Sequence, residues 1–186
     1  QFSSKLGSPE ATIAAGIDYV ENAAVQGCRL ILLPELWTSG YDLENRQNYI
    51  ELNREVLAEL QARAERHDMF IGGSYLTNEH DSYHNTFILL LPGSNHPLRY
   101  HKIHLFRLLE EPKYFQPGSQ PQIADTSLGR IGLAVCYDMR FPEMFRVYGR
   151  EYVNLLLVSA HWGAERTDHW RTLLRARAIE KQFFVA

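Results

Sequence analysis

The sequence lacks the features that mark several broad classes of protein. It has no apolar run long enough to cross a bilayer, no cluster of basic residues and no long run of one charge. Its formal net charge is only -3. These absences predict that neither a membrane nor a nucleic acid is a partner. The first residues, QFSS, also lack the basic start and apolar segment of a signal peptide.

Cysteine is scarce as well. Cys28 and Cys136 are the only two cysteines among 186 residues, which is too few for a disulfide framework. Free thiols are typical of a reducing compartment, so we predict a cytoplasmic location. Cys28 follows a glycine just before an apolar run, and we expect it to be a small buried residue.

The apolar residues that are present follow helical and strand periodicities in alternation. Helices are expected at 9–27, 48–66, 142–149 and 167–181, and strands at 29–33, 69–75, 85–91, 98–102, 131–135 and 153–159. Residues 103–121 are rich in proline and are expected to be mostly loop. The pattern predicts a layered α/β domain with a mixed sheet.

Both ends of the sequence look like interrupted strands. Gln1 and Phe2 resemble the last residues of a strand, and residues 183–186 resemble the first residues of another. We therefore expect residues 1–186 to form one domain that is incomplete at both ends. Because the sequence does not begin with Met, a targeting segment upstream stays open.

Three apolar strands each end in a residue with useful chemistry. Residues 131–135 lead directly to Cys136, which is either a nucleophile or a small core residue. Glu35 follows an apolar run, where a carboxylate must be paired or have a raised pKa, as suits a general base. Lys102 has apolar and aromatic neighbours and can stabilise an oxyanion. A surface charge and a solvated lysine are the plainer alternatives for these two residues.

Together these residues predict one mechanism. Glu35 takes the proton of Cys136, and the thiolate attacks an amide or nitrile carbon. Lys102 and the backbone N–H of Tyr137 stabilise the tetrahedral oxyanion. Ammonia then leaves, and water hydrolyses the thioester.

Histidines suggest two rival interpretations. No pair among His101, His104, His161 and His169 has His-x-x-x-His spacing, and none of them joins a Cys–His cluster, so we expect no metal site. His104 or His161 serving Cys136 would make a Cys–His hydrolase. That chemistry leaves the glutamate and the lysine without a role.

Three segments, 33–41, 102–106 and 135–143, resemble the catalytic motifs of the nitrilase, or carbon–nitrogen hydrolase, superfamily. They occur in that family's order of Glu, Lys and Cys. Segments 111–118 and 170–182 extend the resemblance over essentially the whole chain. The resemblance implies an α-β-β-α sandwich, hydrolysis of a non-peptide carbon–nitrogen bond, and no cofactor.

The resemblance also assigns residues. It implies a triad of Glu35, Lys102 and Cys136. Glu111 falls where the family has a second glutamate that positions the lysine or assists the substrate, although a plain loop carboxylate is the alternative. Its neighbour Glu110 is the less suitable candidate. Family members usually pair through a face near the cysteine and the late helix, so a homodimer is implied. They also have a further C-terminal portion that takes part in pairing.

Residues 159–163 and the late helix resemble the ω-amidase-like branch, whose members deaminate α-keto acid ω-amides such as 2-oxoglutaramate. The partner would then be a small amide with a carboxylate, which needs a cation in the pocket. The residues expected to bind it are Tyr41, Tyr137, Arg140, Trp162 and Arg166. Arg140 and Arg166 are the cations, although Arg166 alternatively forms a salt bridge at a helix start. The chain has His161 where this branch often has Asn, which leaves the exact acyl group open.

Three alternatives remain at this level. The same triad also suits an N-carbamoyl amidohydrolase or a nitrilase. The second alternative is a non-catalytic binding or assembly protein of the same fold, although such a protein has no need for all three residues of the triad. The chain as given is alternatively an inactive fragment of an active enzyme.

Overall fold

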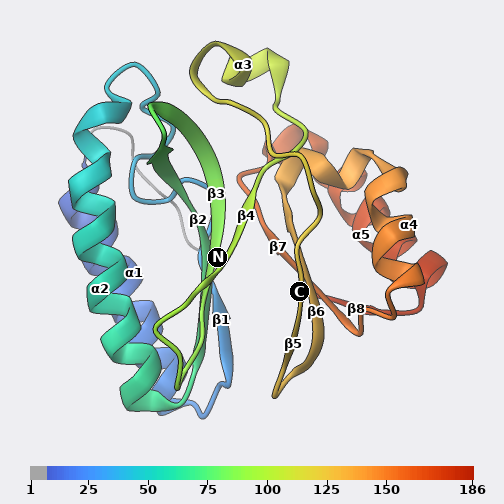
Figure 1. The fold of residues 1–186 in the computed structure, drawn as a ribbon, viewed down its shortest axis with the longest axis horizontal. Coiled ribbons are helices and arrows are strands. Elements are labelled where there is room, and N and C mark those ends of the chain that lie inside the picture. The colour runs from blue at the N-terminus through green and yellow to red at the C-terminus, as the bar shows by residue number, and fades with distance from the viewer. Residues whose placement is uncertain (1–7) are drawn as a thin grey trace.

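The computed structural model describes residues 8–186, which form four layers in the order helices, sheet, sheet, helices (Figure 1). Helices α1 and α2 cover the outer face of one sheet, and α4 and α5 cover the outer face of the other. This is the α-β-β-α arrangement that the resemblance implied. The strand expected at Gln1 and Phe2 lies outside the described residues.

The helices are α1 Pro9–Val25, α2 Tyr49–His67, α3 Glu111–Tyr114, α4 Pro142–Arg150 and α5 Thr167–Lys181. The strands are β1 Leu30–Leu32, β2 Phe70–Glu79, β3 Ser82–Leu90, β4 Leu98–His101, β5 Ile123–Thr126, β6 Gly129–Val135, β7 Leu155–Ser159 and β8 Phe184–Val185. Short 3₁₀ turns lie at Arg46–Asn48, Arg107–Leu109, Cys136–Arg140 and Ala164–Arg166.

Each sheet has four strands and is mixed. In the first, of order β1-β2-β3-β4, β1 runs parallel to β2 and the other pairs are antiparallel. In the second, of order β5-β6-β7-β8, only the β5–β6 pair is antiparallel. The two sheets are tied where β1 and β7 end, because the Ser159 hydroxyl donates to the Leu33 carbonyl at 3.0 Å. Residues that follow these strand ends are therefore brought together.

Two large apolar clusters hold the layers. One is centred on the second sheet, with Leu133 and Leu157 fully buried, and also takes in Phe87 of the first sheet. The other packs α1 and α2 on the first sheet through residues such as Val20 and Leu60. Burying such side chains is the main driving force for assembling the layers.

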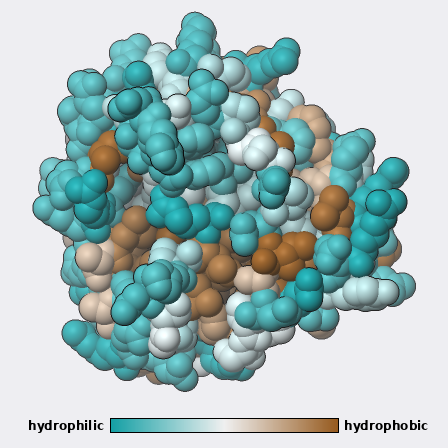
Figure 2. Space-filling view, viewed as in Figure 1, coloured by the Kyte–Doolittle hydropathy of each residue, from teal (hydrophilic) through white to brown (hydrophobic). Residues whose placement is uncertain are grey.

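The face shown in Figure 2 is mostly hydrophilic, with hydrophobic side chains reaching the surface in its middle. None of the helices within residues 8–186 combines the length and the apolar character needed to cross a membrane.

The structure corrects several local expectations. Cys28 is exposed rather than buried, because it lies in the turn between α1 and β1. Strand β5 and helix α3 were not expected, and the single mixed sheet expected from the pattern is divided into two. The β2–β3 hairpin is also longer than expected, because only His80 and Asp81, both with positive φ, form the turn. Such a two-residue turn matches the twist of the paired strands.

Candidate active site

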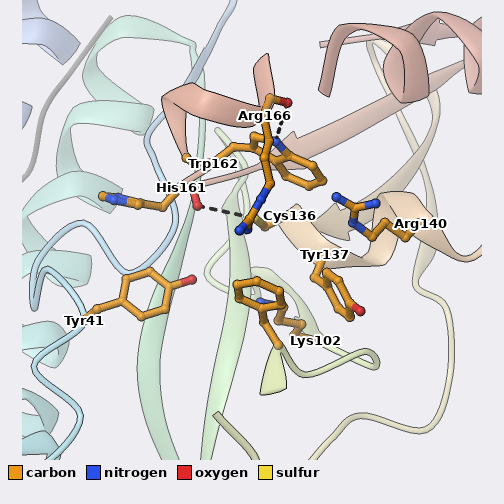
Figure 3. A pocket seen from close by; sticks show the side chains of 10 residues that line it. Tyr41, Lys102, Cys136, Tyr137, Arg140, His161, Trp162 and Arg166 are labelled. Atoms are coloured by element: carbon orange, nitrogen blue, oxygen red, sulfur yellow. Dashed lines mark hydrogen bonds between the residues drawn. The ribbon is translucent and has the colours of Figure 1, made fainter. Parts of the chain in front are cut away.

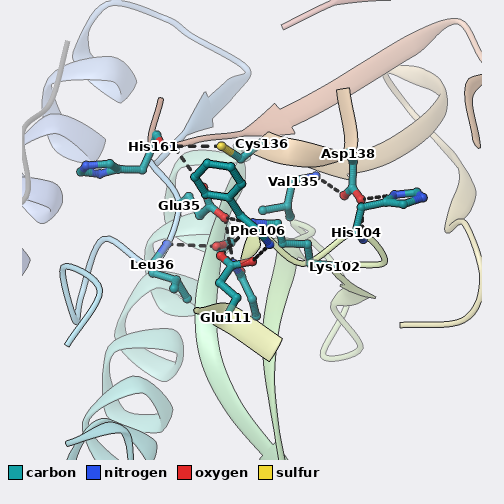
Figure 4. A network of polar contacts seen from close by, with 12 residues as sticks. Glu35, Leu36, Lys102, His104, Phe106, Glu111, Val135, Cys136, Asp138 and His161 are labelled. Atoms are coloured by element: carbon teal, nitrogen blue, oxygen red, sulfur yellow. Dashed lines mark hydrogen bonds and ion pairs between the residues drawn. The ribbon is translucent and has the colours of Figure 1, made fainter. Parts of the chain in front are cut away.

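The structure brings the four predicted catalytic side chains together at the ends of strands (Figure 4). Glu35 lies just beyond β1, Lys102 directly follows β4, and Cys136 directly follows β6. Glu111 is the first residue of α3. All four are buried, and the two glutamates have no exposed surface.

Lys102 joins the two glutamates. Its Nζ donates to Glu35 Oε1 at 2.7 Å and to Glu111 Oε1 at 2.8 Å. Burial disfavours the ammonium, but the charges of the two carboxylates outweigh that effect and raise the pKa of Lys102. The lysine therefore stays charged. An ammonium has three N–H donors, so one remains for the pocket that Lys102 lines.

Glu35 is held as a carboxylate. Burial raises its pKa, but the Lys102 charge together with hydrogen bonds from Lys102, Cys136 and Tyr41 lowers the pKa below its usual value. Asn85 Nδ2 also donates to Oε1 at 2.8 Å, and the His161 backbone N–H donates to Oε2 at 3.1 Å. Of the two sequence-based options, pairing rather than a raised pKa applies.

Cys136 is held as a neutral thiol. Burial and then the negative charge of Glu35 raise its pKa well above the usual value, more than the charge of Lys102 lowers it. Its Sγ also donates to the His161 carbonyl at 3.5 Å. A carboxylate beside a neutral thiol is the resting state of a general base and its nucleophile. Proton transfer is then favourable only as the new C–S bond forms and the charge moves toward Lys102.

This resting state predicts how Cys136 responds to alkylation. Only the thiolate reacts, so the rate of carboxamidomethylation by iodoacetamide follows the thiolate fraction. Because the pKa of Cys136 is raised, the rate should still rise with pH beyond about 8.5, the ordinary pKa of a cysteine. Mass spectrometry of the peptide that contains Cys136 measures this rate. A plateau below pH 8 would contradict the neutral thiol.

Glu111 has a different environment from Glu35. Its Oε2 accepts the Phe106 backbone N–H at 2.7 Å, and its Oε1 accepts the Tyr41 hydroxyl at 3.3 Å. Burial raises its pKa more than Lys102 lowers it, and the nearby charge of Glu35 adds to the increase. Its neighbour Glu110 instead forms an exposed ion pair with Lys113. The geometry therefore favours Glu111 over Glu110 as the residue that positions Lys102.

Lys102→Met should destabilise the fold. The change leaves Glu35 and Glu111 buried without a cation, and removing one partner of a buried ion pair costs about 3–5 kcal/mol. Burial and mutual repulsion then raise the pKa of both carboxyls above their unfolded values. The free energy of unfolding is therefore highest while both carboxyls are protonated, and it falls as the pH rises through their pKa values in the folded state. The deficit should therefore be larger at pH 8 than at pH 5.

Urea unfolding at these two pH values measures that deficit. Lys113→Met is the matched control, because Lys113 is exposed and its ion pair is with the exposed Glu110. This change should alter stability little. An equal deficit at both pH values would count against two uncompensated carboxyls.

A pocket opens over Cys136 and Lys102 (Figure 3). All five residues expected to bind substrate line it: Tyr41, Tyr137, Arg140, Trp162 and Arg166. The structure adds Phe106, His161 and Gly163 to the lining.

The two arginines of this pocket have few partners. The Arg140 guanidinium lies 5.1 Å from the centre of the Trp162 ring and, within the described residues, forms no ion pair. Among residues 8–186, the ion pair of Arg166 is with Glu165, at 3.9 Å. The salt bridge considered for Arg166 is therefore weak. Both guanidinium groups are available to an anionic ligand.

The family model for carbon–nitrogen hydrolases matches residues 1–186. The chain belongs to the carbon–nitrogen hydrolase family. A Bacillus subtilis relative named 2-oxoglutaramate amidase is 35% identical, covering 100% of this chain and 72% of that protein. A Yersinia enterocolitica relative named omega-amidase YafV is 38% identical, covering 88% of this chain and 62% of that protein. The chain therefore spans about two thirds of the length of these relatives.

The fold agrees with that of a solved member of the family. XC1258 from Xanthomonas campestris, a CN-hydrolase superfamily protein, superposes with a TM-score of 0.89 at 30% identity. The match covers 100% of this chain and 72% of that chain. The predicted α-β-β-α sandwich and the predicted family are thereby confirmed.

Neither His161 nor His104 is placed to act as the base of Cys136, as the rival Cys–His chemistry would require. The ring of His161 points away from Cys136, and only its backbone carbonyl contacts the thiol (Figures 3 and 4). His104 Nδ1 lies 2.8 Å from Asp138 Oδ1, and its ring stacks on Phe141. In the described part of the chain, no group of three or more His, Cys, Asp and Glu side chains is placed to hold a metal ion.

Some polar residues that shape the site were not identified from the sequence. Asn85 bonds Glu35, and Ser74 in turn donates to Asn85 Oδ1 at 2.7 Å and receives the Leu36 backbone N–H at 3.0 Å. Both side chains are buried in strands whose other buried residues are mostly apolar. An Asn or Ser within a buried strand was the signal, because such groups are kept only where they are hydrogen-bonded.

Proposed function

We propose that this protein is an ω-amidase that hydrolyses the terminal amide of a small α-keto acid, such as 2-oxoglutaramate, through a thioester on Cys136. One observation carries the proposal: a nucleophile, a carboxylate base and a charged lysine meet in a small pocket that also holds two arginines without strong partners. Membership of the carbon–nitrogen hydrolase family and the names of the relatives support it.

The mechanism follows from the contacts. Glu35 accepts the thiol proton while Sγ of Cys136 adds to the amide carbon. The carbonyl oxygen becomes an oxyanion, which takes the free N–H of Lys102 and the backbone N–H of Tyr137. Glu35 returns its proton to the nitrogen as the C–N bond breaks, and ammonia leaves. Water, deprotonated by Glu35, then adds to the thioester and releases the acid and the thiol.

The arginines supply the specificity. When the amide carbon of a substrate lies at Cys136, its other end, which carries the carboxylate, can lie elsewhere in the pocket beside Arg140 and Arg166. Tyr41 and Trp162 also line the pocket. This arrangement favours an ω-amide that carries a carboxylate over an uncharged amide or a nitrile.

The direct test is ammonia release by the full-length protein. 2-Oxoglutaramate, glutamine, an N-carbamoyl amine and an aliphatic nitrile are compared, with Cys136→Ala as the blank. Release that favours 2-oxoglutaramate and disappears in the variant supports the proposal. Cys136-dependent release from another substrate would keep the mechanism and replace the substrate. No release from any of the four would defeat the proposal in favour of a binding protein.

Arg140→Gln and Arg166→Gln should act on the charged substrate alone. A hydrogen bond to a charged group contributes about 1.5–3 kcal/mol, so KM for 2-oxoglutaramate should rise about 10- to 100-fold. KM for butyramide, an uncharged amide, should change little. Arg66→Gln is the matched control, since Arg66 is exposed on α2 and does not line this pocket. An equal change for both substrates would argue against a carboxylate site.

We also propose a homodimer that pairs through α4 and α5. The family resemblance supports it, and Val147, Ile179 and Phe184 are exposed hydrophobic residues on or beside these helices. Light scattering of the full-length protein tests the mass. The cytoplasmic location stays a prediction, which cell fractionation tests.

A further inference from the structure

Behind the reactive residues lies a buried carboxylate that the mechanism does not use. Asp138 is fully buried and accepts four hydrogen bonds. Its Oδ2 accepts the Tyr100 hydroxyl at 2.8 Å and the Val135 backbone N–H at 2.9 Å. Its Oδ1 accepts the His104 backbone N–H at 3.0 Å and the His104 ring at 2.8 Å, Nδ1 to oxygen. An ionised carboxylate only accepts, so this ring nitrogen carries its proton toward Asp138.

Two of the donor residues flank Lys102. Tyr100 is in β4, two residues before the lysine, and His104 is two residues after it. The regular strand ends one residue before Lys102, whose backbone keeps one bond to the sheet, because its N–H donates to the Asn85 carbonyl at 2.9 Å. Asp138 lies in the turn that follows β6 and adds side-chain contacts on both sides of Lys102, through Tyr100 and through His104. Figure 4 shows the contact with His104.

The remaining donor precedes the nucleophile. Val135 is the last residue of β6, and Cys136 follows with a φ of 44°, a conformation that favours glycine and is costly for other residues. The bond between the Val135 N–H and Asp138 closes this turn across Cys136. The same carboxylate therefore fixes the strained turn that presents the thiol.

We propose that Asp138 is a positioning residue, which keeps Lys102 and Cys136 in the mutual arrangement that the reaction needs. The proposal rests on the function proposed above. The two groups come from different sheets, and a misplacement of about 1 Å costs on the order of 100-fold in rate. A buried carboxylate with four donors and two attachment points is suited to prevent that misplacement.

Asp138→Asn tests the role with almost no change of volume. An amide has one acceptor oxygen, so its NH₂ group must face two of the four donors in either orientation. The backbone N–H of Val135 or of His104 then loses its partner. We expect kcat to fall about 100-fold, while KM changes by less than about threefold because Asp138 does not line the pocket. The pH at which alkylation of Cys136 reaches its half-maximal rate should also differ from that of the wild type.

Asp125→Asn is the control, because it makes the same chemical change at a carboxylate whose side chain is 78% exposed. Unfolding curves report the folded fraction of each variant. A role in stability alone would lower that fraction and leave kcat per folded molecule and the alkylation profile unchanged, and this result would overturn the proposal.

Tyr100→Phe keeps the test decisive if Asp138→Asn does not fold. It removes one of the four donors and retains the carboxylate, so kcat should fall by about 2- to 10-fold. Wild-type kcat in a folded Tyr100→Phe would then overturn the proposal. Cys136→Ser, assayed alongside, separates the two levels. Turnover by Cys136→Ser would defeat the proposed function. An inactive Cys136→Ser together with wild-type kcat in Asp138→Asn would defeat only the positioning role.

Discussion

Replacing Cys136 with serine should lower the rate of ammonia release by a factor on the order of 10⁴–10⁶ while leaving the protein folded. Serine fits the space of the thiol. Its hydroxyl is a far weaker acid, however. Glu35, which is hydrogen-bonded to Cys136, is a weak base because its own pKa is lowered rather than raised. A weak acid beside a weak base does not form the nucleophile.

The same substitution at the second cysteine is the matched control. Cys28 is exposed in the turn after α1, so Cys28→Ser should keep wild-type turnover and stability. Ammonia release from 2-oxoglutaramate by both variants measures the difference. Turnover by Cys136→Ser within tenfold of wild type would mean that the thiol does not carry the acyl group.

The parts of the site that could be predicted from the sequence are those that local patterns encode. Glu35, Lys102 and Cys136 each follow an apolar run that ends abruptly, which places a reactive side chain at a strand end. Their convergence depends on which strand ends meet, and the resemblance to a known family supplied that information. Their catalytic roles stay predictions until they are assayed.

The residues that were missed or misplaced depend on tertiary contacts. The Glu35 carboxylate is bound by the side chain of Asn85 and the backbone of His161, 50 and 126 positions away in the chain. Strand β5 is short and only half-buried, so its sequence has no clear alternation. Cys28 was expected to be buried because an apolar strand follows it, yet the turn ends before that strand begins.

Glu35→Gln should lower kcat by about 10²- to 10⁴-fold, because it removes the proton acceptor while keeping the size of the side chain. Lys102 keeps its bond to Glu111, so the lysine stays charged and in place. One of the two carboxylate oxygens becomes an NH₂ group, which weakens the contacts from Asn85 or from the His161 N–H. Glu110→Gln, at an exposed carboxylate, should leave turnover unchanged.

The same variant should move the reactivity of the thiol in the opposite direction from turnover. The negative charge of Glu35 raises the pKa of Cys136, whereas Lys102 lowers it. Removing only the negative charge should therefore lower the pKa of the thiol, so that alkylation reaches its half-maximal rate at a lower pH than in the wild type. Loss of the general base should thus give an enzyme whose cysteine ionises more readily but whose turnover is slower.

Glu111→Gln separates this effect from a general loss of charge. It also neutralises a carboxylate bound to Lys102, but Glu111 is not among the groups with the largest effects on the pKa of Cys136. Its alkylation midpoint should stay closer to that of the wild type than the midpoint of Glu35→Gln. If both variants moved the midpoint equally, the buried charge as a whole would control the thiol. The assignment of Glu35 as its specific base would then fail, even if both variants had lost activity.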